Sequence, residues 1–530
     1  MKKFLSTCVL ASALAWAQSK NPHKFSSDLA DIDTRSNAAV IVQWNGGVDD
    51  RKHQKVVNLG GSVRASLPSI NAGAYTVPAA ALADLGADPE VAYISPDRPV
   101  RAQLDYTAAA INADAAWNAG WNGAGIGVAV IDSGINPDPN LTDASGQSRI
   151  VFSHDFVSAA SPATAAAQSA PDLFGHGEHV AGIVGANGVT SNCSNCTRDF
   201  IGIAPGVNLL NLRVLDQNGE GSDSAVIAAI ETAILLKPIY NVRVINLSLG
   251  RPIYESYRFD PLCRAVEAAW RAGIVVVVAA GNDGRDNTFG NLGYGTIMAP
   301  ANDPYVITVG AMKTMSTYPR TDDLIASYSS KGPTQIDHVV KPDLVAPGNL
   351  VVSLLAPGAT LEAQYPGNDI TLGYYESGLA ALQAQQPSSD YFILSGTSMA
   401  AAVVSGAAAD VIHANPALTP DQVKLLLMKT AYKTFPPSSI ATDPTTGQTY
   451  IDYYDIFTVG AGYLDVEAAL GSVKNVRRRG IAVSAIAHYQ PASGVVMLTF
   501  DVPDRSVWDY QSVWDYQSVW DSAAVWAQPS

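Results

Sequence analysis

The chain has few cysteines and few charged residues for its length. Four cysteines in 530 residues are too few for a disulfide-stapled scaffold, and charged residues make up only 15%. The fold must therefore depend on a hydrophobic core, and 47% of the residues are hydrophobic. Single cores stop growing near roughly 250 to 300 residues, so we expect more than one domain.

Positive charge is also scarce. Lys and Arg total 33 against 48 Asp and Glu, which gives a net charge of −15. This balance argues against nucleic acid or an anionic membrane surface as the main partner. No apolar run after residue 17 approaches the roughly 18 residues that a spanning helix needs. We expect an acidic, soluble monomer without an integral membrane segment.

The N-terminus has the pattern of an export signal. Lys2 and Lys3 precede an apolar run over 4–16, and residues 15–17 (AWA) form a small-x-small cleavage site. This pattern predicts a secretory signal peptide over 1–17 and an extracellular or periplasmic protein. Cys8 would leave with the signal.

Three cysteines remain after signal removal. Cys193 and Cys196 form a C-x-x-C pair that fits half a zinc site, a redox pair or a small disulfide loop. No second C-x-x-C exists and the thioredoxin context is missing, so we favour the disulfide. Cys263 is expected to be a buried thiol on an amphipathic helix.

A small unit follows the polar residues 18–38. Its pattern predicts strands over 39–43, 64–67, 74–77 and 91–95, with helices over 49–58 and 79–85. This βαββαβ order is typical of a two-layer α+β domain of the ferredoxin-like kind.

The long middle region alternates apolar runs with helical segments. The runs are 128–131, 207–212, 242–247, 274–279 and 306–309, and the clearest helices are 224–236 and 261–272. Continuous apolar strands separated by helices indicate an α/β fold, a parallel sheet covered on both faces. In such sheets the chemistry lies at the carboxyl ends of the strands.

Four polar residues stand at such ends. Asp132 closes the first run, Asn282 closely follows the fourth, and His176 and Ser398 each open an apolar helix. Each also has a common structural explanation, as a turn or a helix cap. A serine becomes nucleophilic only beside a base that is itself oriented, so Ser398 needs the other residues.

Together these motifs resemble the subtilisin-like serine peptidases, the subtilases. The matching segments are 129–134 (AVIDSG), 175–182 (GHGEHVAG) and 395–400 (SGTSMA), in the order Asp, His, Ser, with 341–348 (KPDLVAPG) as a further match. The resemblance covers roughly 104–473 and implies a three-layer subtilisin-like catalytic domain. Segment 39–100 resembles the inhibitor-type propeptide that precedes many of these enzymes.

The resemblance implies a role for each residue. Ser398 would attack the scissile carbonyl to form an acyl-enzyme, His176 would move the proton, and Asp132 would hold the imidazole. Asn282 would stabilise the oxyanion with the Ser398 backbone N–H. Two segments would bind an extended protein or peptide substrate: Ser248, Leu249 and Gly250, and Ala279, Ala280 and Gly281. No cofactor is required for this chemistry.

The resemblance also implies a zymogen. The expected parts are a signal peptide (1–17), a propeptide (18–103), a peptidase domain (104–473) and a C-terminal extension (474–530). The propeptide would inhibit its own enzyme, with 91–103 covering the cleft, until self-cleavage near Gln103 or Leu104. The extension repeats the hexapeptide SVWDYQ from residue 506, with no assigned function.

Several features depart from the family or stay open. Glu178 stands where the family usually has Thr or Ser, and an acid in a first helical turn should be tolerated and stabilising. Ala402 stands where the family favours Pro. Structural Ca²⁺ is possible, with oxygen ligands in 132–140 and 282–287, but no EF-hand spacing places it. Insertion 358–390 is expected to line or cover the cleft.

Other functions fit less well. Residues 396–400 lack the final glycine of an esterase G-x-S-x-G elbow, and 176–179 (HGEH) is not the H-E-x-x-H of a metallopeptidase. The remaining alternative is a secreted binding protein on an inactive subtilase scaffold, with the Trp-rich tail as its working end.

Overall fold

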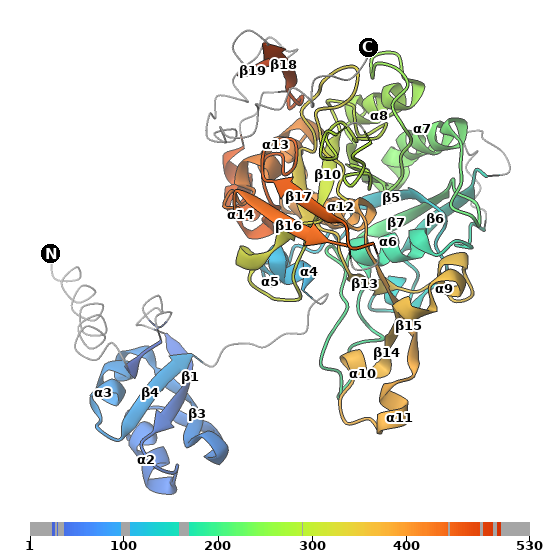
Figure 1. Ribbon diagram of the computed structural model, residues 1–530. Helices are drawn as coiled ribbons and strands as arrows, with labels where there is room; N and C mark the ends of the chain where they lie inside the picture. Colours follow the sequence, from blue (N-terminus) through green and yellow to red (C-terminus); the bar gives the residue numbers. More distant parts are fainter. Residues whose placement is uncertain are drawn as a thin grey trace. The chain divides into compact units, whose positions relative to one another are not determined.

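The computed structural model describes residues 24–26, 29, 36–96, 106–157, 169–288, 290–443, 446–476, 481–490 and 495–499 (Figure 1). The chain divides into two compact units, Met1–Arg101 and Ala102–Ser530. The predicted signal peptide, the cleavage site near Gln103 and the hexapeptide repeat lie outside the described residues.

The small unit has the predicted order of elements. Its elements are β1 (Asn37–Trp44), α2 (Asp50–Asn58), β2 (Ser62–Leu67), β3 (Ala72–Pro78), α3 (Leu82–Ala87) and β4 (Val91–Pro96). The sheet is antiparallel in the order β2-β3-β1-β4. Alternate residues of β1 are buried, and they share one core with Val56 of α2 and Leu85 of α3. The two helices thus pack on one face of the sheet.

The large unit is built on the predicted parallel sheet. Its strands are β5 (Gly127–Asp132), β6 (Ile150–Asp155), β7 (Asn208–Arg213), β8 (Val242–Leu247), β9 (Val275–Ala279), β10 (Ile307–Lys313), β11 (Leu324–Ile325) and β12 (Leu344–Pro347). The order is β11-β10-β9-β8-β5-β7-β6, with β12 also paired to β10. All pairs are parallel except β10 with β11. Every residue of β5 and β9 is buried, which explains their continuous apolar sequences.

Helices surround this sheet. They are α4 (Thr107–Ala110), α5 (Asp114–Asn118), α6 (His176–Gly185), α7 (Asp223–Tyr240), α8 (Pro261–Arg271), α12 (Thr397–Ala414), α13 (Pro420–Thr430) and α14 (Val466–Ser472). Helix α12 contacts β8, β9, β10 and β12 and packs against α6. Within the described residues it is the one helix long and apolar enough to cross a membrane, but 83% of that stretch is buried in the protein. Its apolar character is that of a core helix.

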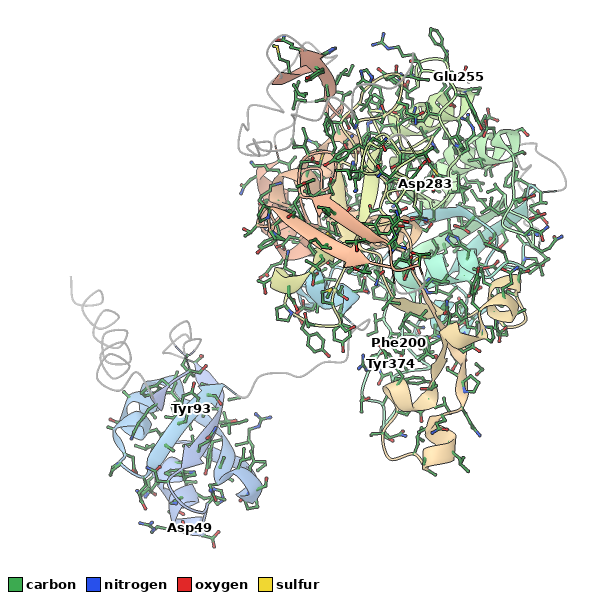
Figure 2. The ribbon with its side chains drawn as sticks, in the orientation of Figure 1. Asp49, Tyr93, Phe200, Glu255, Asp283 and Tyr374 are labelled. Atoms are coloured by element: carbon green, nitrogen blue, oxygen red, sulfur yellow. A yellow bond between two sulfur atoms is a disulfide. The ribbon has the colours of Figure 1, made fainter. Side chains whose placement is uncertain are left out.

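Insertion 358–390 forms most of a separate lobe (Figure 1). The lobe holds β13 (Val351–Leu354), α9 (Thr360–Gln364), β14 (Asp369–Thr371), α10 (Leu372–Tyr375), α11 (Ala381–Ala384) and β15 (Pro387–Leu394). Its beginning lies near the site, because the N–H groups of Thr360 and Leu361 donate to the carbonyls of Leu173 and Phe174, just before His176. Farther along the lobe, Tyr374 of α10 stacks on Phe200, which lies outside the lobe, with ring centres 6.4 Å apart (Figure 2).

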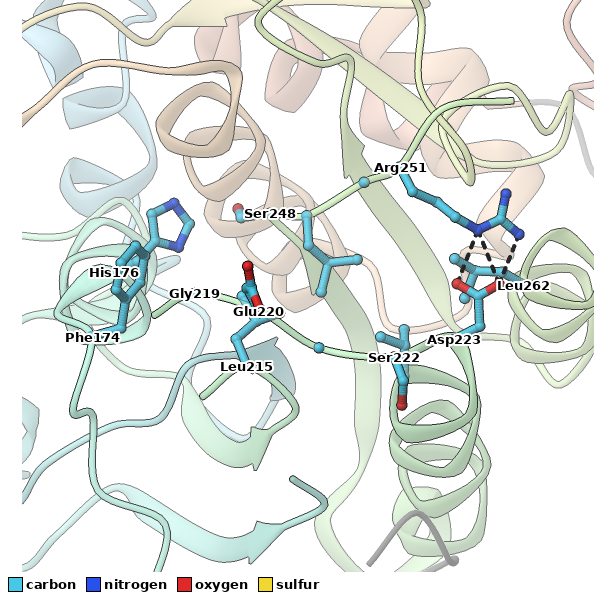
Figure 3. Close-up of a pocket in the computed structure, with 14 residues that line it drawn as sticks. Phe174, His176, Leu215, Gly219, Glu220, Ser222, Asp223, Ser248, Arg251 and Leu262 are labelled. Atoms are coloured by element: carbon cyan, nitrogen blue, oxygen red, sulfur yellow. Dashed lines mark hydrogen bonds and ion pairs between the residues drawn. The ribbon is translucent and has the colours of Figure 1, made fainter. Parts of the chain in front are cut away.

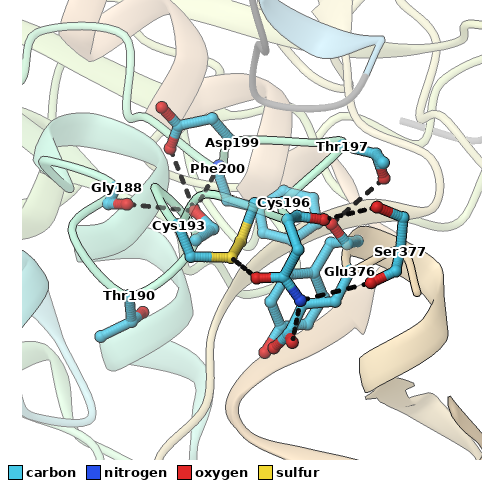
Figure 4. Close-up of a disulfide and its surroundings, with 12 residues drawn as sticks. Gly188, Thr190, Cys193, Cys196, Thr197, Asp199, Phe200, Glu376 and Ser377 are labelled. Atoms are coloured by element: carbon cyan, nitrogen blue, oxygen red, sulfur yellow. Dashed lines mark hydrogen bonds between the residues drawn. A yellow bond between two sulfur atoms is a disulfide. The ribbon is translucent and has the colours of Figure 1, made fainter. Parts of the chain in front are cut away.

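A small loop closed by a disulfide is hydrogen-bonded to this lobe (Figure 4). Cys193 and Cys196 are bonded, as favoured from the sequence. Asn195, inside the closed loop, donates through Nδ2 to Glu376 Oε2 and to the carbonyl of Ser377, both at 3.3 Å. Cys263 is a fully buried free thiol on α8, also as predicted.

Two hairpins complete the described chain, β16 (Ser438–Thr442) with β17 (Thr449–Tyr453) and β18 (Ile486–Gln490) with β19 (Val495–Thr499). The start of the predicted C-terminal extension packs against the large unit, since Val340 donates its N–H to the carbonyl of Ala485 at 2.8 Å. Ser484 Oγ donates to the buried carboxylate of Asp343.

Candidate active site

An aspartate and a histidine meet at the carboxyl edge of the sheet. Asp132 is the last residue of β5 and His176 the first of α6, and His176 Nδ1 lies 2.7 Å from Asp132 Oδ1. The Asp132 side chain is 1% exposed and that of His176 is 16% exposed. Glycine permits this approach, because a Cβ on Gly177 would lie 2.3 Å from the carbonyl oxygen of Gly134. The two predicted residues are therefore held together by a hydrogen bond.

The electrostatic surroundings favour a proton on His176. Burial lowers the pKa of its imidazole, but the charge and hydrogen bond of Asp132, with the charge of Asp172, outweigh burial and leave the pKa raised. A histidine in this setting readily holds a proton taken from a neighbour.

Ser398 lies beside the segment that follows β8. It is the second residue of α12, and its Oγ donates to the carbonyl oxygen of Ser248 at 3.2 Å. Ser248 Oγ in turn donates to the Ser398 carbonyl at 2.8 Å. Across the described residues, the Ser398 hydroxyl is thus bonded to Ser248 and not to His176. Ser398 and His176 nevertheless adjoin the same pocket, because His176 and Ser248 both line it.

This pocket has a volume of about 510 Å³ (Figure 3). Leu249 and Gly250, both predicted to bind substrate, line it together with Phe174, Leu215, Val226 and Leu262. At its far end Arg251 forms ion pairs with Asp223 at 2.8 Å and Asp260 at 2.9 Å. Arg251 balances one of these two carboxylates, so the three groups together keep one negative charge.

A further carboxylate lines the pocket without a cationic partner. Glu220 lies between His176 and Arg251 and reaches toward the segment that begins at Ser248 (Figure 3). Within the described part of the chain its carboxylate has no hydrogen bond or ion pair. The pocket therefore carries an excess of negative charge.

Asn282 is held in one orientation beside Ser398. Its Oδ1 accepts the backbone N–H of Thr397 at 2.9 Å and the Thr397 hydroxyl at 3.1 Å. Because a carboxamide is planar, the Nδ2 donor must face away from Thr397. A Cβ on Gly396 would lie 3.5 Å from Nδ2, so the free donor adjoins the loop that leads into Ser398. The predicted residues Ala279, Ala280 and Gly281 precede Asn282, and the Gly281 N–H donates to Thr397 Oγ1 at 3.2 Å.

Several contributing residues were missed by the sequence reasoning. Thr397 orients Asn282. In the sequence, the one indication of this role is that Thr397 carries a hydroxyl and stands next to Ser398. Asn246 on β8 donates through Nδ2 to Ser248 Oγ at 2.9 Å and accepts the Ser405 hydroxyl at 2.8 Å. These buried polar residues connect β8 to α12. In the sequence they could have been found as polar residues within otherwise apolar segments.

A buried aspartate supports the loop before His176. Asp172 accepts the Ser133 hydroxyl at 2.8 Å, the Gly175 N–H at 2.7 Å and the Glu178 N–H at 2.8 Å. These bonds satisfy N–H groups at the start of α6 and connect them to the residue after Asp132.

Glu178 lies in the first turn of α6, as predicted, and its effect on the enzyme stays a prediction. Its side chain is fully buried and accepts the Asn136 N–H. Its Oε1 has no hydrogen-bond partner among the described residues. Burial, followed by the charges of Asp138 and Asp172, raises the pKa of Glu178 well above its usual value. Ionisation here is costly, so the helix-dipole argument does not decide its effect.

The described residues contain no group of three or more His, Cys, Asp or Glu side chains that could hold a metal ion. Structural calcium stays a prediction.

An aspartate-bound histidine near a serine, at the carboxyl edge of a parallel sheet, is typical of serine hydrolases. Residues 123–456, more than half of the chain, match the family model described as "Subtilase family". The chain is 33% identical over 423 residues to Serine protease AprX of Bacillus subtilis, covering 76% of this chain and 85% of that protein. It is 31% identical over 385 residues to Subtilisin E of the same organism, covering 72% and 81%. An Extracellular serine proteinase of a Thermus species is 34% identical over 369 residues, covering 67% and 69%.

The chain therefore belongs to the subtilase family, as the motifs indicated. It is a serine-type endopeptidase that needs no cofactor for its chemistry.

Proposed function

We propose that this protein is a secreted, self-processed endopeptidase that cleaves proteins with a triad of Asp132, His176 and Ser398. One observation carries the assignment. His176 is bound to the buried Asp132 at 2.7 Å, and the Ser398 hydroxyl lies on the Ser248 carbonyl, which borders the same pocket as His176.

Acylation follows from this arrangement. An extended substrate paired with 248–250 would donate its own N–H to the Ser248 carbonyl and compete with the Ser398 hydroxyl there. Rotation about the Cα–Cβ bond then turns Ser398 Oγ toward His176 Nε2, which takes its proton as Oγ attacks the scissile carbonyl. His176 delivers that proton to the leaving amine and later deprotonates the water that hydrolyses the acyl-enzyme.

Two donors would stabilise the oxyanion. Asn282 Nδ2 is available because Thr397 occupies Oδ1. The Ser398 N–H is the second, since N–H groups in the first turn of a helix have no intrahelical partner. Both donors are fixed before substrate arrives, which is what electrostatic catalysis requires.

The remaining parts of the proposal concern maturation. The signal pattern over 1–17 and the printed name of the extracellular Thermus relative support secretion. The βαββαβ unit over 37–96 supports a propeptide that inhibits the enzyme until the chain is cut near Gln103. The substrates are proteins or peptides in extended conformation, bound by 248–250 and 279–281.

Secreted wild type and the Ser398→Ala variant test this proposal. N-terminal sequencing should find wild type beginning within several residues of Leu104, and the variant retaining its propeptide. Wild type that stays uncut and does not hydrolyse casein would contradict self-processing and activity together.

A further inference from the structure

Two adjoining loops of the large unit expose large apolar side chains. The loop before α8 exposes Tyr254 at 75% and Phe259 at 72%, and a second loop exposes Ile336 at 54%. Asp337 holds the loops together, because its carboxylate accepts the Ser256 hydroxyl at 2.6 Å and the following backbone N–H at 2.9 Å. We call Tyr254, Phe259 and Ile336 the loop patch. Single apolar residues are normal on a surface, but three on two bonded loops make a candidate interaction surface.

The backbone of Ile336 has an unfavourable conformation. Its φ is +68°, in the left-handed region that a β-branched residue rarely adopts. The turn is held closed because the Thr334 N–H donates to the Val339 carbonyl at 2.9 Å and the Val339 N–H donates to Thr334 Oγ1 at 2.9 Å. Conformations of this kind concentrate at functional sites, which favours a binding role for Ile336.

The last described residue lies near the loop patch. Thr499 of β19 pairs with Ile486 of β18, and Ile486 forms a bridge with Val339. Neighbouring strands lie about 4.8 Å apart, so Thr499 is about 10 Å from Val339. Ile336 stands three residues before Val339, which adds at most about 11 Å. The chain therefore leaves the described residues within roughly 20 Å of the loop patch.

The residues beyond Thr499 carry the hexapeptide repeat. It begins at Ser506, and seven residues of extended chain reach up to about 25 Å, so the first repeat can reach the loop patch. The repeat length is an even number, which matters for an extended segment. All four tryptophans and both tyrosines of 506–526 stand at even positions, whereas all three aspartates and all four valines stand at odd positions. An extended tail therefore has one aromatic face, opposite a face of Val, Asp and Gln.

We propose that this tail docks on its own large unit as an extended segment, with its aromatic face on the loop patch and its aspartates toward solvent. Aromatic rings bury a large apolar area, and their partners in the patch include the exposed rings of Tyr254 and Phe259. The Tyr254 ring also lies 6.0 Å from the guanidinium of Arg251, which lines the pocket of Figure 3. The docked tail thus lies beside the outer end of that pocket. This docking goes beyond the proposed function and does not depend on catalysis.

A tethered segment needs little affinity of its own. A short linker gives an effective concentration in the mM range, so a segment with a separate Kd of about 0.1 mM is docked about nine-tenths of the time. Side chains beneath it should react with a dissolved reagent about tenfold more slowly than when they are uncovered.

Hydroxyl-radical footprinting of the full chain, read by mass spectrometry, tests the docking. Every protein carries Ser398→Ala to prevent self-digestion. The aromatic-face variant carries Trp508→Ser, Trp514→Ser, Trp520→Ser and Trp526→Ser. The matched control carries Val507→Ser, Val513→Ser, Val519→Ser and Val525→Ser.

We expect Tyr254 and Phe259 to oxidise about tenfold faster in the aromatic-face variant than in the parent, and at the parent rate in the valine variant. Leu382, which is 83% exposed on α11, is the internal reference and should react equally in all three proteins. In the reciprocal experiment, Tyr254→Ser combined with Phe259→Ser should speed oxidation of the tail tryptophans, whereas Leu382→Ser should not.

Three results would overturn the proposal. The first is equal oxidation of Tyr254 and Phe259 in the parent and the aromatic-face variant, or of the tail tryptophans in the parent and the reciprocal variant. The second is an equal loss of protection in the valine variant, which would exclude docking by the aromatic face. The third is protection that disappears on dilution together with dimers in analytical ultracentrifugation, because the tail would then dock on a second copy.

Discussion

Asn282 Oδ1 accepts the backbone N–H of Thr397 at 2.9 Å, across 115 residues of sequence. The residue beside Ser398 thus determines which way the amide of Asn282 faces. A donor already oriented toward a developing charge needs no reorganisation during the reaction.

Asn282→Leu keeps the branched shape of the side chain but removes the donor. We expect kcat to fall by about 10²–10³ with little change in KM, a magnitude already known from a subtilisin, which belongs to the same family. Thr397→Val should lower kcat less, because only one of its two bonds to Oδ1 is lost, and Thr397→Ser should restore it. Steady-state kinetics on a peptide nitroanilide measure this. Equal activity of the Asn282→Leu variant and wild type would remove Asn282 from the mechanism.

The fall of kcat/KM on the acid side of the pH profile should follow the protonation of His176. A general base works only when neutral, so kcat/KM should rise with pH through the pKa of His176. Since Asp132 and Asp172 raise that pKa, the midpoint is expected above the ordinary value of about 6.5.

Asp132→Asn removes the charge that raises this pKa and leaves the burial that lowers it. The limb should then move to lower pH, and kcat should fall by about 10⁴ because the histidine tautomer is no longer fixed. Profiles of kcat/KM from about pH 5 to 9 measure both effects. A limb that stays in place would show that another group titrates.

The buried carboxyl of Glu178 should make stability depend on pH. Its pKa is raised in the folded state, so its protonated form contributes stability that is complete below the unfolded value of about 4.3. That contribution is lost as pH rises through the folded pKa. Glu178→Gln cannot ionise, so it should become more stable than the parent as the solution is made alkaline.

Urea midpoints at acidic and alkaline pH measure the difference, with both proteins carrying Ser398→Ala to prevent autolysis. A stability difference that is the same at both pH values would contradict the burial of an ionisable group here.

The uncompensated Glu220 should select basic residues in the pocket of Figure 3. Glu220→Gln should lower kcat/KM for peptides with Lys or Arg upstream of the scissile bond by about two- to fivefold, as expected for an exposed ion pair, and added salt should shrink the effect. Glu255→Gln is the matched control, because Glu255 is exposed and does not line this pocket. A peptide library cleaved identically by both variants would argue against a role for Glu220.

Much of the fold could be predicted, because a parallel strand buried on both faces shows in the sequence as a short, continuous apolar run. Strand β9 is apolar throughout and β5 is apolar up to its last residue, Asp132, so both strands could be predicted directly. Strand β6 was missed because its sequence mixes Ser, His and Asp with apolar residues at a partly covered position.

The candidate site could be predicted where a polar residue of a short motif stands at the end of a helix or strand. Asp132, His176 and Ser398 each stand at such an end, within short motifs. The role of Thr397 was not predictable, because its contact with Asn282 joins segments 115 residues apart in the chain. The burial of Glu178 was not predictable either, because its partner Asn136 lies in a different segment.

In the proposed mechanism, Ser398 is a nucleophile that His176 activates. The most direct measurement is peptide mapping by mass spectrometry after a fluorophosphonate has reacted with the secreted enzyme. We expect one adduct, on Ser398, which is absent from Ser398→Ala and forms much more slowly in His176→Ala. An active enzyme with no adduct on Ser398 would contradict it.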